Sequence, residues 1–199
     1  DPEGRIGVAR IAVEGDVDFL LKNAETCKQI KTENGTTPLM LASARGQAQS
    51  INALLQIGMD VNQVDSQGES ALGYAAVFNR VETVEFLLLA GADLKTKRPD
   101  GITILMRSVQ LGSPQLIYAL SINKREINAR AEDGWTALYF AIRRKDPEIL
   151  SWLLHQGACP NVHDIEKQTP LEFAQEVKWP EGVRVLQSAR TCKLSGKSH

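Results

Sequence analysis

A repeat of 33 residues runs through most of the chain and limits the fold to an array of similar units. Glycine recurs at one position of the repeat, and leucine or a small residue recurs at three others. The occupants are Gly35, Gly68, Gly101 and Gly134; Leu39, Leu72, Leu105, Leu138 and Leu171; Leu54, Leu87, Leu120, Leu153 and Leu186; and Ala42, Ala75, Ser108, Ala141 and Ala174. Four positions that keep one period predict a stack in which each unit contacts only its neighbours.

Each unit reads as a turn followed by two short helices. The glycines supply the positive φ that a tight turn needs. Hydroxyl residues suited to cap the first helix follow, at Thr37, Ser70, Thr103, Thr136 and Thr169. The second helix shows apolar spacing such as Val84, Leu87 and Leu88. Gly58, Gly91 and Gly157 are placed to end it.

These residues resemble the ankyrin repeat. The matching segments are 35–39 with Ala42, 88–93, 134–138 with Ala141, and 168–171 with Ala174. The resemblance covers residues 34–190 and implies an all-α ankyrin-repeat solenoid, with helix-turn-helix units joined by β-hairpin-like finger loops. The expected boundaries are 1–33 for an N-terminal extension and degenerate capping repeat, 34–66, 67–99, 100–132 (divergent) and 133–165 for four repeats, 166–190 for a C-terminal capping repeat, and 191–199 for a flexible tail.

Two features depart from the family pattern. The histidine usual after the first leucine is replaced by Met40, Gly73, Met106, Tyr139 and Glu172, so we expect its hydrogen-bond network to be absent or altered. In repeat 100–132, Ile104 stands where proline is usual and Lys124 where glycine is usual. That repeat is expected to be the least well ordered, or the one reshaped for a partner.

Composition excludes several classes of function. Lys plus Arg number 23 and Asp plus Glu 24, and a nucleic-acid binder usually carries a basic excess. The longest apolar stretch, near residues 86–94, contains Gly91 and Asp93 and is too short for a membrane span. No nucleotide-binding motif occurs, and we expect no cofactor. Three widely spaced cysteines do not indicate a disulfide framework.

A catalytic or metal site is the alternative from another class. His155, Cys159 and His163 are spaced by four residues, as metal ligands can be. The spacing crosses a predicted helix–loop boundary, so it does not place them on one helical face. The basic run at 143–145 is interpreted as a solvated helix end or as a site for a phosphate or an acidic partner.

A partner-binding face is expected along the finger loops and the first helices. Steps of four residues place Trp135, Tyr139 and Arg143 in one stripe, and Trp, Tyr and Arg are enriched at binding hot spots. The other candidate contacts are Ile102, Met106, Gln110, Glu69 and Phe78. In the competing interpretation, Trp135 and Tyr139 pack against neighbouring fingers. Phe140 and Phe173 share a phase with Leu41 and are predicted to be core.

The resemblance implies a non-catalytic module that binds a folded protein, for instance an enzyme. Composition gives no reason to expect an obligate homodimer, so we expect a monomer. The chain begins Asp1-Pro2 without Met, as after trimming or removal of a signal peptide. It is similar to small exported bacterial ankyrin proteins. This suggests a periplasmic inhibitor or immunity protein that occludes an enzyme such as a cell-wall peptidase. A cytoplasmic adaptor that tethers partners is the alternative.

Overall fold

The computed structural model describes residues 17–95, 98–120 and 126–189. These ranges contain twelve α-helices and no strand, and Val64 and Ser70 form an isolated antiparallel bridge. The prediction of an all-α array of paired helices is confirmed. The chain divides into two compact units, residues 1–99 and 100–199. In the described ranges, no helix is long and apolar enough to span a membrane.

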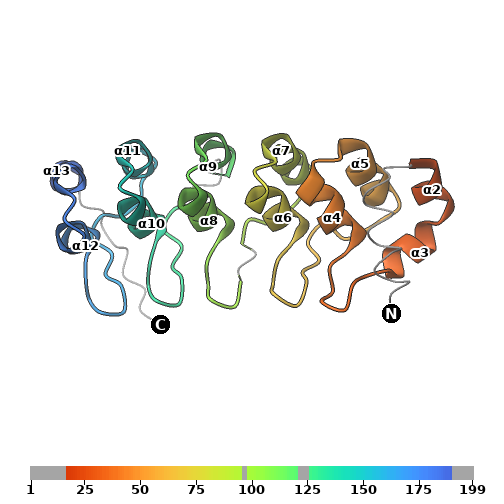
Figure 1. The fold of residues 1–199 in the computed structure, drawn as a ribbon, viewed down its shortest axis with the longest axis horizontal. Helices are drawn as coiled ribbons and strands as arrows, with labels where there is room; N and C mark the ends of the chain where they lie inside the picture. Colours follow the sequence, from red (N-terminus) through yellow and green to blue (C-terminus); the bar gives the residue numbers. More distant parts are fainter. Residues whose placement is uncertain (1–16, 96–97, 121–125, 190–199) are drawn as a thin grey trace. The chain divides into compact units, whose positions relative to one another are not determined.

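The described part of the first unit contains three helix pairs (Figure 1, red to yellow-green). The helices are α2 (Val17–Lys22), α3 (Ala24–Gln29), α4 (Pro38–Arg45), α5 (Ala48–Gln56), α6 (Ala71–Val77) and α7 (Val81–Leu89). Helix α4 packs against α5 and α6, α6 packs against α7, and α2 packs against α5. The repeated leucines Leu39, Leu54, Leu72 and Leu87 are all buried between these helices.

Among its described residues, the second unit also has three helix pairs (Figure 1, green to blue). The helices are α8 (Ile104–Leu111), α9 (Pro114–Leu120), α10 (Ala137–Arg144), α11 (Pro147–His155), α12 (Pro170–Glu176) and α13 (Pro180–Ser188). Helix α10 packs against α8, α11 and α12, while α13 packs against α11 and α12. Phe140 and Phe173 are buried, as predicted, and Trp179 is buried against the glycine in α13.

Hydroxyl caps begin the first helices of four repeats. Thr37, Ser70, Thr103 and Thr169 each accept a hydrogen bond from the backbone N–H of the third helical residue. Thr136 does not cap α10, contrary to the prediction. The N–H of Tyr139 instead donates to the backbone carbonyl of Thr136 at 3.0 Å. The Thr136 hydroxyl is buried and has no hydrogen-bond partner in the described structure.

The finger loops turn at the predicted glycines. Gly35, Gly68, Gly101 and Gly134 all have positive φ, and Lys167 takes the corresponding conformation in the last repeat. Neighbouring fingers within a unit share one backbone hydrogen bond. Ser66 donates to Asn34 in the first unit, and Glu132 donates to Asp100 and Ile165 to Asp133 in the second. The fingers therefore stand at fixed spacing within each unit.

The residues that replace the family histidine show how the network is altered. The Sδ atoms of Met40 and Met106 accept from the backbone N–H of the capping threonine, at 3.3 and 3.5 Å. The carboxylate of Glu172 accepts both the N–H and the hydroxyl of Thr169 at 2.7 Å. These side chains close the first turn of their own helix.

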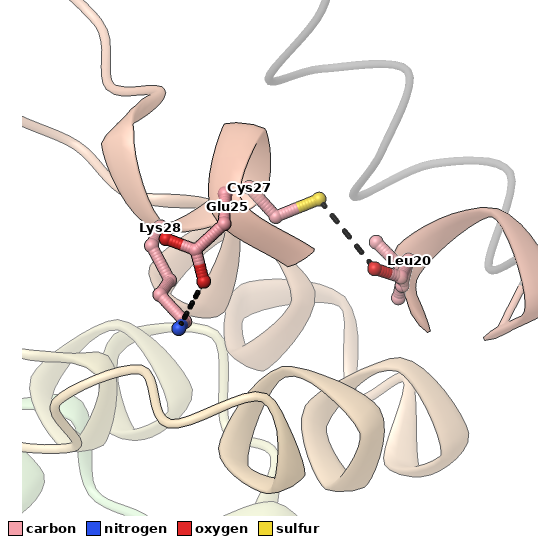
Figure 2. A network of polar contacts seen from close by, with 4 residues as sticks. All are labelled: Leu20, Glu25, Cys27 and Lys28. Carbon is pink, nitrogen blue, oxygen red and sulfur yellow. Dashed lines mark hydrogen bonds and ion pairs between the residues drawn. The ribbon is translucent and has the colours of Figure 1, made fainter. Parts of the chain in front are cut away.

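The N-terminal helices of the first unit enclose a buried thiol (Figure 2). The Sγ atom of Cys27 on α3 lies 4.0 Å from the carbonyl oxygen of Leu20 on α2. Burial raises the pKa of this free thiol. On the exposed side of α3, the Nζ of Lys28 lies 2.7 Å from the Glu25 carboxylate. Cys27 therefore acts as a small apolar core residue.

Some predictions fall on residues outside the described ranges. These are the first half of the degenerate repeat, the Lys124 substitution, and the tail 191–199.

Candidate partner-binding face

The predicted stripe on α10 comes from one finger and one helix. Trp135 lies at the end of the finger, and Tyr139 and Arg143 follow on α10. The Trp135 side chain is half-buried and Arg143 is exposed, but Tyr139 is 0% exposed. The stripe therefore has two accessible members and one buried member.

An aromatic cluster holds Trp135 in place. Its ring stacks on Tyr139 with centroids 5.5 Å apart and an interplanar angle of 17°. Phe140 meets Trp135 edge-on at 5.5 Å, and Phe173 of the next repeat lies 5.0 Å away. Aromatic pairs at these distances attract one another beyond the area that they bury. Trp135 is consequently presented on a rigid base.

Arg143 lies over the same cluster. Its Cζ atom is 5.3 Å from the Trp135 ring centroid and 5.2 Å from that of Phe140, both within cation–π range. In the described ranges no carboxylate forms an ion pair with Arg143. Its guanidinium is therefore oriented by two aromatic rings.

Tyr139 is structural, which corrects its assignment as a direct partner contact. Its hydroxyl lies 2.8 Å from the carbonyl oxygen of Val162 and 2.6 Å from that of Gln168. Both acceptors belong to the next finger. Burial and the nearby Asp164 raise the pKa of the phenol, which keeps it protonated as a donor. Tyr139 thus stacks on Trp135 and hydrogen-bonds to the next finger.

The candidates on the preceding repeat also divide by burial. Met106 is 1% exposed and its sulfur accepts from Thr103, so it too is no direct contact in the folded array. Ile102 is half-buried and Gln110 is exposed. The backbone carbonyl of Gln110 accepts from Nη1 of Arg144 at 2.9 Å, which ties α8 to α10.

Glu69 and Phe78 belong to the first unit. Glu69 is half-buried, and its carboxylate occupies the space that a Cβ on Gly73 would fill. Phe78, at the end of α6, is 53% exposed. These two residues remain candidate contacts on that unit.

Two groups of polar residues beside the stripe were not among the partner contacts predicted from the sequence. The corresponding stripe on α12 is Gln168, Glu172 and Glu176, and the Gln168 amide donates to the Glu176 carboxylate. Arg144 and Arg130 donate to backbone carbonyls of adjacent repeats. The 33-residue step identifies the α12 stripe in the sequence. Only the fold shows that its carboxylates accept hydrogen bonds within the array.

The alternative metal site is not formed. No group of three potential ligands comes together in the described residues, which include His155, Cys159 and His163. The Nδ1 of His155 lies 2.7 Å from the Ser151 carbonyl oxygen of its own helix. Cys159 is disulfide-bonded, which removes its thiolate as a ligand.

Comparison with curated proteins finds short local likenesses. Over 69 residues, 35% of the chain, it is 38% identical to neurogenic locus notch homolog protein 2 of Homo sapiens and of Mus musculus. It is equally similar to neurogenic locus notch homolog protein 1 of Rattus norvegicus. The matched segment spans about 3% of the length of these relatives.

A solved structure and a family model cover far more of the chain. The crystal structure of EF0377, an ankyrin repeat protein, superimposes with a TM-score of 0.80 over 92% of this chain and 97% of that one, at 23% identity. That likeness concerns the fold. The model of ankyrin repeats in three copies matches residues 9–98 and 105–195. Ankyrin repeat arrays are generally non-catalytic modules for protein–protein interaction. This chain belongs to the ankyrin repeat family.

Proposed function

We propose that the chain binds a folded protein partner through a surface on its second unit, here named the Trp135 face. This face consists of Ile102, Gln110, Trp135 and Arg143. The observation that carries the proposal is the pairing of a half-buried Trp135 with an Arg143 that lies over its ring and has no carboxylate partner in the described ranges. Trp and Arg are the residue types most enriched at hot spots.

The buried layer beneath the face supports this proposal. Tyr139, Phe140 and Phe173 fix the orientation of Trp135 before any partner arrives. A preorganised surface loses little conformational entropy when it binds. The exposed guanidinium favours a partner that offers a carboxylate next to an apolar group, because Arg pairs with carboxylates through two parallel hydrogen bonds.

We propose further that the Trp135 face acts by occlusion, as an inhibitor or immunity protein does when it covers the active site of an enzyme such as a bacterial cell-wall peptidase. An adaptor that tethers partners is the second candidate. An activity assay distinguishes the two: an occluding protein suppresses turnover of the captured enzyme at stoichiometric ratio, whereas an adaptor leaves turnover unchanged. A signal sequence in the precursor would favour the exported inhibitor.

The test of the face is Trp135→Ala, compared with wild type by affinity capture from the source organism and then by titration against the captured protein. We expect a loss of about 2 kcal/mol in binding, roughly 30-fold in Kd. The control is Leu89→Ala, which removes a side chain that is 88% exposed on the other unit. Circular dichroism melts check that the variants fold.

Arg143→Ala provides a second variant that removes no buried side chain. It is expected to weaken binding as well, with a melting temperature near that of wild type. Equal affinity of wild type and both variants would place the binding surface elsewhere. If Trp135→Ala lowers only the folded fraction and Arg143→Ala has no effect, the cluster serves only to hold the stack together.

A further inference from the structure

A small cavity lies between the second helices α9 and α11, away from the residues of the Trp135 face. Its volume is about 30 Å³, and its walls include Tyr118 on α9 and Trp152, Asp146 and Glu148 at α11. A water molecule occupies a comparable volume in the liquid. The cavity therefore has room for one small head group.

Two aromatic residues, Tyr118 and Trp152, line the cavity. The Tyr118 and Trp152 centroids are 5.0 Å apart and the ring planes are tilted by 59°. Tyr118 is 51% exposed and Trp152 is half-buried, so neither ring is sealed inside the core. Ring faces carry partial negative charge and attract cations.

Two acidic residues, Asp146 and Glu148, also line the cavity. Asp146 caps α11, and its Oδ1 accepts from the backbone N–H of Ile149 at 3.0 Å. Glu148 is exposed in the first turn of the same helix. In the described ranges neither acid forms an ion pair, and the cavity wall contains no Lys or Arg. Acidic residues are common at a helix N-terminus, which explains their presence here. That preference does not explain why an aromatic pair lines the same cavity.

We infer that this cavity binds the ammonium head group of a lysine side chain from a partner protein. The ring faces of Tyr118 and Trp152 receive the cation and its adjoining methylene groups. The Glu148 carboxylate and the Oδ2 of Asp146 supply the opposite charge. This contact is separate from the Trp135 face, and it adds a specific requirement, a lysine, to what the array recognises.

The first unit offers an internal control. Glu82 occupies the same place in α7 as Glu148 does in α11, and Asn52 and Phe86 stand at the positions of Tyr118 and Trp152. A glutamate at the start of the second helix therefore occurs in both repeats. Of the two places compared, only the α9–α11 cavity has a pair of aromatic residues.

The test is an NMR titration of the ¹⁵N-labelled full chain with Nα-acetyl-lysine methylamide, observed at the tryptophan indole N–H signals. A Trp152→Phe variant assigns the Trp152 signal. The neutral probe is Nα-acetyl-norleucine methylamide, which keeps the chain of methylenes and lacks the ammonium. We expect the lysine probe to shift the Trp152 signal saturably and to bind at least about threefold more tightly than the norleucine probe.

Two matched substitutions follow. Glu148→Gln is expected to weaken lysine binding about threefold, while Glu82→Gln leaves it unchanged. Equal response to the two probes would overturn the inference, since the cavity would then be an apolar crevice. An equal effect of both glutamine variants would also overturn it, because the acid would then act through general charge. These readouts do not depend on Trp135, so failure of the proposed function is seen separately.

Discussion

Repeats 67–99 and 133–165 share a frame and differ in what they display. Leu72 and Ala75 in α6 are 0% exposed, and so are Leu138 and Ala141 in α10. Between these fixed positions, the stripe on α6 reads Glu69, Gly73 and Val77, whereas that on α10 reads Trp135, Tyr139 and Arg143. The comparison shows that packing fixes the helix and leaves its stripe free to vary.

The two repeats also bind their neighbouring fingers differently. In the first unit, the Tyr74 hydroxyl donates to Asp65 of its own finger at 2.8 Å and lies 3.4 Å from Thr36 of the preceding one. In the second unit, Tyr139 reaches the following finger. A tyrosine one position apart in the repeat thus secures a different loop.

The largest expected difference between the repeats is in the free energy of unfolding after an alanine substitution. The substituted position is the third residue of the first helix in each repeat. Tyr139→Ala removes a buried ring and should lower the free energy of unfolding by about 3–5 kcal/mol. Gly73→Ala should raise it by about 0.5–1 kcal/mol, because alanine favours a helix interior over glycine. The Glu69 side chain has to turn outward to make room. Equilibrium urea denaturation measures both changes.

Tyr139→Phe separates the ring from its hydroxyl. It keeps the aromatic cluster and leaves two carbonyl groups without their donor, with an expected cost of about 1–3 kcal/mol. A loss as large as that of Tyr139→Ala would show that the hydroxyl dominates. Equal losses for Gly73→Ala and Tyr139→Ala would break the comparison between the repeats.

A smaller difference is expected at the caps. Thr136→Val should leave stability unchanged or raise it slightly, because the threonine hydroxyl is buried without a partner. Thr103→Val, the matched change in the preceding repeat, should cost about 1 kcal/mol through loss of the cap to Met106. Thermal melts compare the two variants. A substantial loss for Thr136→Val would mean that this hydroxyl does stabilise the fold.

The smallest expected effect is on the pH dependence at Glu172. Hydrogen bonds from Thr169 lower the pKa of this carboxyl in the folded state. Its contribution to stability is therefore present above the pKa of the unfolded chain and is lost as the pH falls through the folded value. The stability difference between wild type and Glu172→Gln should shrink below about pH 4. In a Thr169→Val background, the Glu172 pKa measured by NMR should return toward its ordinary value; an unmoved pKa would contradict this account.

Much of the fold followed from periodicity because buried positions tolerate few residue types. Leucine recurs wherever a helix faces a neighbour, and glycine recurs where the backbone takes a positive φ. The candidate face was only half predictable. The spacing placed Trp135, Tyr139 and Arg143 on one stripe, but spacing does not predict how deeply each side chain is buried. Tyr139 and Met106 proved buried, while Trp135 remained accessible.

The order and pairing of the helices, their turns and most of their caps were determined by the sequence alone, because each depends on residues within one repeat or its neighbour. Only the tertiary structure decided how far each stripe residue is exposed, and that α10 begins without a side-chain cap. It alone brought Tyr118 and Trp152, 34 residues apart, to one cavity. Burial and cavities depend on how the side chains of several helices pack together. The period of the sequence does not specify that packing.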